Sequence, residues 1–180
     1  MIRGFFLFIV ILFSCCSSNN NKNNKKIIKN PNSVSRINVP VFNEDSAYFF
    51  IQEQVDFGPR FLSSPGWEKC SFYLENKLKT YTKNVFVQEA LTKTYDNKKH
   101  TLKNIIASFS PEKNNRIVLM AHWDTRHIAD YDTINQNQPI LGANDGGSGV
   151  AVLLELARSF HLQRPNIGID IILFDAEDYG

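Results

Sequence analysis

Two short apolar runs, each followed at once by acidic or imidazole side chains, constrain this sequence more than any other feature. The runs are 117–121, which leads into His122 and Asp124, and 169–174, which leads into Glu177 and Asp178. The first run is apolar throughout, as is typical of a strand buried on both faces, and the second reads as another buried strand. Polar groups that follow such strands gather outside the carboxyl ends of an open sheet, where α/β proteins bind their ligands. The pattern therefore predicts an α/β domain with a site at that edge.

A glycine-rich stretch, 142–149, separates the two runs and opens an apolar-periodic helix that we expect over 148–161. Because glycine permits positive φ and a close approach of the backbone to a ligand, such a stretch is typical of a binding loop. Its carboxylate, Asp145, is therefore a candidate site residue. The alternative is that Asp145 or Ser148 caps the following helix. The residues alone leave both interpretations open.

The adjacent carboxylates Glu177 and Asp178 form the second candidate group. Two carboxylates that face one cavity repel each other, which tends to raise a pKa. A divalent cation relieves this repulsion, with one carboxylate as its ligand and the other as a base. Alternatively, the two acids begin another helix, whose N-terminus favours negative charge.

His122 and Asp124 form the third group, and they share one side of an extended segment because residues i and i+2 point the same way. They make a metal site, or a ligand with its supporting partner, unless His122 is a half-buried histidine satisfied by its neighbours. Nitrogen and oxygen donors without a thiolate fit Zn²⁺ at an open catalytic site. Further candidates for contact with a ligand are Trp123, Arg126, Asn144 and, in the long loop 126–141, His127.

The rest of the sequence supplies helices and strands for the same domain. The expected elements are helices over 46–55 and 65–81, strands over 85–90 and 102–108, and a hairpin turn at 97–99. The candidate N-caps are Asp45 or Ser46 for the first helix and Ser63 or Ser64 for the second. This order of helices and strands favours an α/β fold with a partly parallel sheet.

Composition limits the partners of the chain. The 180 residues suffice for one sizeable domain, and a formal net charge of +2 is too small to indicate a nucleic-acid partner. Cys15 and Cys16 lie near the N-terminus, whereas Cys70 lies on an apolar helical stripe. We therefore expect Cys70 to be an inert buried thiol and the folded part to contain no disulfide.

The N-terminus predicts export. Residues 1–16 combine one positive charge, a short apolar run and small residues, as secretory signals do. The segment that ends at Cys15 resembles a bacterial lipobox, so Cys15 is the expected lipidation site. The alternatives are lipidation of Cys16, a plain cleaved signal peptide and an uncleaved anchor. Residues 17–38, rich in Asn and Lys, predict a disordered tether, and residues 39–180 form the expected folded domain. The chain would then be an exported cell-envelope lipoprotein, held at a lipid bilayer and facing the periplasm or the outside.

Four segments carry a family resemblance when they are taken together. They are Gly58-Pro59-Arg60 with Ser64-Pro65-Gly66, Ala121-His122-Trp123-Asp124-Thr125-Arg126, Gly142-Ala143-Asn144-Asp145-Gly146, and Phe174-Asp175-Ala176-Glu177-Asp178-Tyr179-Gly180. This set resembles the zinc aminopeptidase and glutaminyl cyclase superfamily, and most closely its bacterial glutaminyl-peptide cyclotransferase branch. The resemblance covers residues 45–180 and implies an α/β fold with a mixed, largely parallel central sheet flanked by helices.

The resemblance also implies a role for each site residue. Asp145 and Asp178 would bind zinc, and Glu177 would act as general base and general acid. His122 would bind a second zinc in an aminopeptidase but would only line the site in a cyclase with one zinc, and Asp124 would support it. The implied substrate is the N-terminus of a peptide or protein.

The implied reaction is the cyclisation of an N-terminal glutamine to pyroglutamate with release of ammonia. Zinc would polarise the side-chain amide carbonyl, and Glu177 would carry a proton from the attacking amine to the leaving nitrogen. The alternatives are a two-zinc aminopeptidase of the same superfamily and a non-catalytic surface lipoprotein. The superfamily pattern also includes a third zinc ligand, a histidine, and further strands after the position of Gly180. We therefore expect a truncated product or a fragment that binds zinc weakly and turns over poorly.

Overall fold

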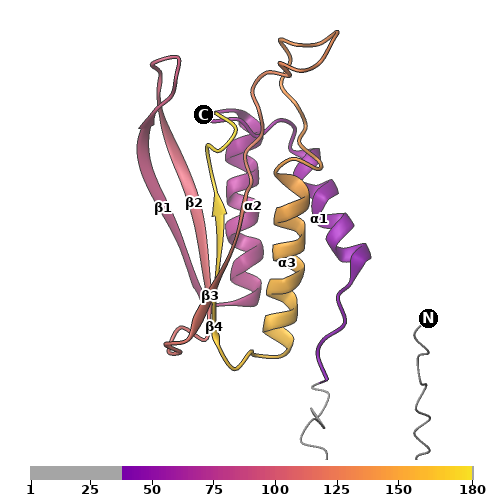
Figure 1. Ribbon diagram of the computed structural model, residues 1–180, viewed down its shortest axis with the longest axis vertical. Coiled ribbons are helices and arrows are strands. Elements are labelled where there is room, and N and C mark those ends of the chain that lie inside the picture. The colour runs from indigo at the N-terminus through magenta and orange to yellow at the C-terminus, as the bar shows by residue number, and fades with distance from the viewer. Residues whose placement is uncertain (1–37, 180) are drawn as a thin grey trace, which may run out of the picture. The chain divides into compact units, whose positions relative to one another are not determined.

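The computed structural model describes residues 38–179, and their elements are labelled in Figure 1. The signal sequence, the lipidation site Cys15 and the tether up to residue 37 lie outside the described residues, so they stay predictions of the sequence. Within the described part, no helix combines the length and the apolar character needed to cross a bilayer.

One mixed sheet carries the fold, with the strand order β1-β2-β4-β3. The strands are β1 (Asn84–Lys93), β2 (Lys99–Phe109), β3 (Arg116–His122) and β4 (Gly168–Phe174). β3 and β4 run parallel, whereas β1 with β2 and β2 with β4 run antiparallel. The expected mixed sheet is confirmed. The expected excess of parallel pairs is not seen among the described strands, because β1 with β2 and β2 with β4 are both antiparallel and only β3 with β4 is parallel.

Within residues 38–179, three helices accompany the sheet: α1 (Glu44–Asp56), α2 (Pro65–Tyr81) and α3 (Gly147–Leu162). Ser64 caps α2 as expected, since its hydroxyl accepts a hydrogen bond from the Trp67 amide at 3.1 Å. The expected cap of α1 at Asp45 or Ser46 is wrong. Asn43 is the N-cap, and its side-chain oxygen accepts from the Ser46 amide at 2.8 Å. An asparagine at this position satisfies an amide that the helix itself leaves without a partner.

The core lies between the sheet and the helices α2 and α3, while α1 packs against α3. The sheet contributes buried side chains that alternate along β2 and β4, among them Ile105, Ala107, Ile171 and Leu173. Cys70 of α2 belongs to this core, and burial raises the pKa of its thiol to about 12, as expected for an inert cysteine.

The opposite face of the sheet is open in the described part of the chain. A row of register partners runs across it, formed by Phe86, Ile106, Ile172 and Met120. Phe86 and Met120 are exposed, whereas the buried residues of β2 and β4 point to the helices. Helices α2 and α3 therefore cover one face of the sheet, and the described residues leave the other face open, although both faces are rich in apolar side chains.

The parallel pair β3 and β4 fixes the position of the site. Since the two strands run in the same direction and His122 pairs with Phe174, the residues that follow them emerge side by side. The glycine-rich turn before α3 and the end of the described chain lie at that same end of the molecule (Figure 1).

Candidate active site

His122 lies at the centre of a cluster of carboxylates beyond β3 and β4. Its Nε2 lies 3.1 Å from an oxygen of Asp145. Its Nδ1 lies 3.5 Å from Asp124 and 3.8 Å from Glu177. The structure therefore brings together side chains from three separate segments, all of which were sequence candidates.

Asp124 holds the turn that follows β4. Its carboxylate is fully buried and accepts hydrogen bonds from the backbone amides of Glu177, at 3.2 Å, and Asp178, at 3.1 Å. The turn also places Ala176 at a φ of 68°, a left-handed conformation that is costly for a residue with a β-carbon. Such a conformation persists only where its surroundings enforce it, and Asp124 supplies that constraint.

The buried Arg60 ties the other segments of the site to one another. Its guanidinium donates to the carbonyl oxygens of Trp123 at 3.0 Å, Leu141 at 2.8 Å and Gly142 at 2.8 Å. The Arg60 amide also donates to the Thr125 hydroxyl at 2.8 Å. This residue was noticed in the sequence only as part of a motif. Its role depends on carbonyl groups far away in the chain, so residue type and spacing gave no signal for it.

Two glycines allow the loop before α3 to approach the strand end. At Gly142, with φ of 59°, a β-carbon would lie 2.3 Å from a methyl group of Thr125. At Gly146, with φ of 79°, it would lie 2.6 Å from the carbonyl oxygen of Asp124. Any larger residue at either position would push the loop that carries Asp145 away from His122.

The alternative that Asp145 or Ser148 caps α3 is wrong. The N-cap is Gly146, and no side-chain hydrogen bond caps the helix. The Ser148 hydroxyl donates instead to the carbonyl of Asn144 at 2.7 Å. The carboxylate of Asp145 is therefore available to the site, with its side chain 58% exposed.

The candidate ligand contacts fall into two groups. Trp123 is fully buried, stacks on Trp67 and donates its indole N–H to the carbonyl of Lys103, so the prediction that it contacts a ligand is wrong. Its side chain alternates with those of His122 and Asp124 and therefore points into the core. Arg126 and Asn144 do border the site: Arg126 lies 3.4 Å from Asp178, and Asn144 is exposed.

Neighbouring charges shift the pKa values of the cluster in ways that favour a bound cation. Contact with Asp124, together with the charges of Glu177 and Asp178, raises the pKa of His122 to about 9. Burial, reinforced by Asp145 and Asp124, raises the pKa of Asp178. Several carboxylates thus share one imidazole, and a divalent cation would relieve their mutual repulsion.

Four of these residues offer a donor set that suits zinc. One atom each from His122, Glu177 and Asp178 lies within 4.8 Å of the other two. The side chain of Asp178 is only 4% exposed, and its buried Oδ2 has no hydrogen-bonding partner among the described residues. A buried carboxylate oxygen without a partner is costly unless a ligand satisfies it. With Asp145 beside His122, the cluster supplies the nitrogen and oxygen donors that zinc accepts.

Two cavities of different character flank the cluster. One, of about 410 Å³, is bordered by His122, Asn144, Asp145, Gly146 and Ser148. The other, of about 290 Å³, is bordered by the charged side chains of Arg126, Asp130, Glu177 and Asp178 and by the rings of Tyr95, His127 and Tyr179. The cluster therefore lies between a space lined by small polar residues and a space lined by charged groups and rings.

Comparison with known proteins identifies relatives of this arrangement. Residues 104–180 match the model described as Peptidase family M28. The crystal structure of *Tannerella forsythia* glutaminyl cyclase is 50% identical, has a TM-score of 0.77, and is matched over 78% of this chain and 49% of its own. The chain resembles the bacterial glutaminyl cyclases.

Two further relatives show how wide the resemblance is. A leucine aminopeptidase precursor from *Bacteroides thetaiotaomicron* is 50% identical with a TM-score of 0.78, over 80% of this chain and 50% of its own. The glutaminyl-peptide cyclotransferase of *Bos taurus* is 28% identical over 43% of this chain and 23% of its own length. The chain thus spans about half the length of the bacterial structures and less of the bovine enzyme. The fold is that of the zinc exopeptidase-like glutaminyl cyclases.

Proposed function

We propose that the protein converts an N-terminal glutamine of peptides to pyroglutamate and releases ammonia. The observation that carries this proposal is the cluster in which Asp124 presents Glu177 and Asp178 to His122 and Asp145. Its support is the 50% identity to *Tannerella forsythia* glutaminyl cyclase over most of this chain. Because the matched region is about half of that enzyme, the activity belongs to the proposal.

In the proposed reaction the α-amino nitrogen of the substrate attacks the side-chain amide carbon. A bond forms between these two atoms, and the bond from the carbon to the amide nitrogen breaks as ammonia leaves. Glu177, whose side chain is 63% exposed, takes the proton from the attacking amine and returns it to the leaving nitrogen. Since both reacting groups belong to one residue, holding them together accounts for much of the rate.

Asp145 and Asp178 are the proposed zinc ligands, and His122 borders them. When bound, zinc would polarise the carbonyl of the substrate amide as a Lewis acid. Asp178 suits this role because Arg126 contacts its Oδ1 while its buried Oδ2 has no partner within residues 38–179. Asp124 supports the arrangement through the turn that follows β4. One zinc is the stoichiometry we propose for a cyclase.

The test is ammonia release by the full-length protein from a peptide that begins with glutamine. We expect steady release that stops when zinc is removed by a chelator and returns when zinc is added. The same peptide with an acetylated N-terminus is the control, because it has no amine to attack the amide. Release from the acetylated peptide, or none from the free peptide with zinc bound, would contradict the proposal.

The similarity to a leucine aminopeptidase precursor favours a second candidate, a peptidase with two zincs. His122 would then bind the second metal, since it contacts Asp145 and offers an atom within 4.8 Å of atoms of Glu177 and Asp178. This candidate predicts release of free leucine from leucine-initiated peptides and two zincs per chain. The cyclase predicts one zinc, ammonia as a product and no release of leucine.

We also propose that residues 1–16 export the protein and that lipid on Cys15 anchors it to the cell envelope. Support comes from the sequence alone, namely the short apolar run and the small residue before that cysteine. Incorporation of a radiolabelled fatty acid into the wild-type protein, but not into the variant Cys15→Ala, is the expected result. Equal labelling of that variant would point to Cys16.

A further inference from the structure

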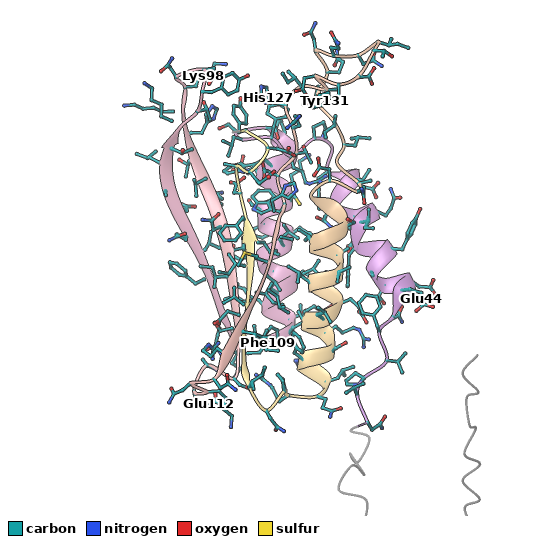
Figure 2. The ribbon with its side chains drawn as sticks, viewed as in Figure 1. Glu44, Lys98, Phe109, Glu112, His127 and Tyr131 are labelled. Atoms are coloured by element: carbon teal, nitrogen blue, oxygen red, sulfur yellow. The ribbon has the colours of Figure 1, made fainter. Side chains whose placement is uncertain are left out.

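We propose that Tyr95, at the tip of the β1–β2 hairpin, is a specificity-determining residue that contacts the second residue of a peptide substrate. This rests on the proposed function, because it assumes that the first residue reacts at Glu177. The sequence alone gives no indication of this role, because the hairpin lies far from Glu177 along the chain. The hairpin tip and the start of the long loop reach the same end of the molecule, where Figure 2 labels Lys98 and His127.

Contacts fix the ring of Tyr95 although 65% of the residue is exposed. Its hydroxyl forms a hydrogen bond with Nε2 of His127 at 3.0 Å. The ring of His127 is stacked on Tyr179, with centroids 4.2 Å apart and planes 16° from parallel. Tyr179 directly follows Asp178, so a continuous set of rings joins the hairpin tip to the turn that carries the reacting groups.

The two cavities beside the cluster suggest how a peptide would lie. A glutamine that closes on its own amine is compact and polar, and it suits the cavity bordered by Asn144, Asp145 and Ser148. The chain after that residue must leave in another direction. The cavity that opens from Glu177 and Asp178 is largely polar, but the ring of Tyr95 at its border is exposed and offers an apolar face.

An exposed aromatic ring that is already held in place favours binding of another apolar or aromatic side chain. Little conformational freedom is lost when a ligand packs on it, because the hydrogen bond to His127 has already ordered the ring. A ring-to-ring contact of this kind changes affinity by about three- to tenfold. The expected preference is therefore for an aromatic second residue over alanine.

The experiment compares two peptides, Gln-Phe-Ala and Gln-Ala-Ala, with the full-length protein loaded with zinc. We expect kcat/KM to favour the phenylalanine peptide by about three- to tenfold in the wild type. In Tyr95→Ala this ratio should fall to near one, with the change mainly in KM. Tyr95→Phe keeps the ring but loses the hydroxyl that orders it, so its ratio should lie between those of the wild type and Tyr95→Ala. The control Tyr48→Ala removes an exposed ring from α1 and should leave the ratio as in the wild type.

Failure of this inference is distinct from failure of the proposed function. Equal rates for both peptides in the wild type, or an unchanged ratio in Tyr95→Ala, would overturn the role of Tyr95 while the cyclase stands. If neither peptide releases ammonia, the proposed function fails, and calorimetric binding of the same two peptides decides the role of Tyr95. Tighter binding of the phenylalanine peptide that is lost in Tyr95→Ala then supports it, and equal binding overturns it.

Discussion

The site is built from two kinds of polar residue that lie a few ångströms apart. Arg60 and Asp124 are fully buried, and hydrogen bonds occupy their polar atoms. Asp145 and Glu177 are more than half exposed and make few contacts apart from those with His122. Arg60 and Asp124 form a frame that fixes the backbone of the site. Asp145 and Glu177 present negative charge to a metal ion or substrate.

The two kinds of residue should affect different properties of the protein, namely its stability and its chemistry. Removing a buried group leaves its partners without hydrogen bonds in the interior, which destabilises the fold. Removing an exposed carboxylate leaves nothing buried without a partner, and here it even reduces the repulsion between acids. Substitutions in the frame should therefore act on folding first, and substitutions among the exposed acids should act on metal binding and turnover.

The largest effect is expected for Arg60→Met, which keeps much of the side-chain length and loses every donor. The carbonyl group of Trp123 would remain buried without its partner, and the carbonyl groups of Gln54, Leu141 and Gly142 would each lose one hydrogen bond. We expect the free energy of unfolding to fall by about 3 kcal/mol or more, since each such group costs about 1–3 kcal/mol. Urea unfolding measures it, and Arg164→Met, at an exposed position, is the control. Equal stability of the two variants would show that Arg60 is not part of a frame.

Glu177→Gln should have the next largest effect, on turnover and not on folding. The amide cannot carry the proton, so kcat should fall by about 100-fold or more. The zinc content, measured by mass spectrometry, should stay near that of the wild type, whereas Asp178→Asn should lose zinc. Glu112→Gln is the control, since Glu112 lies at the opposite end of the molecule (Figure 2). Loss of zinc in Glu177→Gln would instead make Glu177 a ligand, as its place beside His122 and Asp178 allows.

A smaller effect is expected for Asp124→Asn, which preserves shape but replaces one acceptor oxygen with a donor. That donor would face the amide of Glu177 or Asp178, so the turn should loosen at a cost of about 1–3 kcal/mol. Hydrogen exchange at these two amides should accelerate more than exchange in the core strands β2 and β4. Asp45→Asn, at an exposed position in α1, provides the matched comparison. Unchanged exchange at both amides would mean that other contacts hold the turn.

The acids of the cluster were more accessible to sequence reasoning than the frame. Asp145, Glu177 and Asp178 follow apolar runs or glycines, and that local pattern predicts a binding edge. The parallel pairing of β3 and β4 then brings His122 to them. Arg60 and the inward orientation of Trp123 depend on tertiary contacts, with partners as distant in the chain as Leu141 and Lys103. Such partners cannot be found from residue type and spacing alone.

The same distinction applies to the fold: features set by neighbouring residues could be predicted from the sequence, and features set by tertiary contacts could not. The cap of α2 and the approximate extent of each strand follow from nearby residues, and they were predicted. The cap of α1 was missed because Asp45 and Ser46 are as suitable by residue type as Asn43, and only the path of the chain decides among them. The share of antiparallel pairs depends on which strands become neighbours, which periodicity does not reveal.

The smallest change in stability is expected at an ion pair at the start of β4. This pair is charged like the site but lies away from it. Arg116 donates to Asp170 at 2.9 Å and lowers the pKa of that carboxyl below its usual value of 3.8. A lowered pKa contributes stability that is fully present above the usual value and is lost as the pH falls from there through the lowered pKa of the folded state. Asp170→Asn should therefore reduce the loss of stability between pH 6 and pH 3 by less than about 1 kcal/mol, as partly exposed pairs contribute little. Urea midpoints at the two pH values measure this. If the variant and the wild type lose equal stability, the acid sensitivity comes from other carboxylates, and those around His122 are the next candidates.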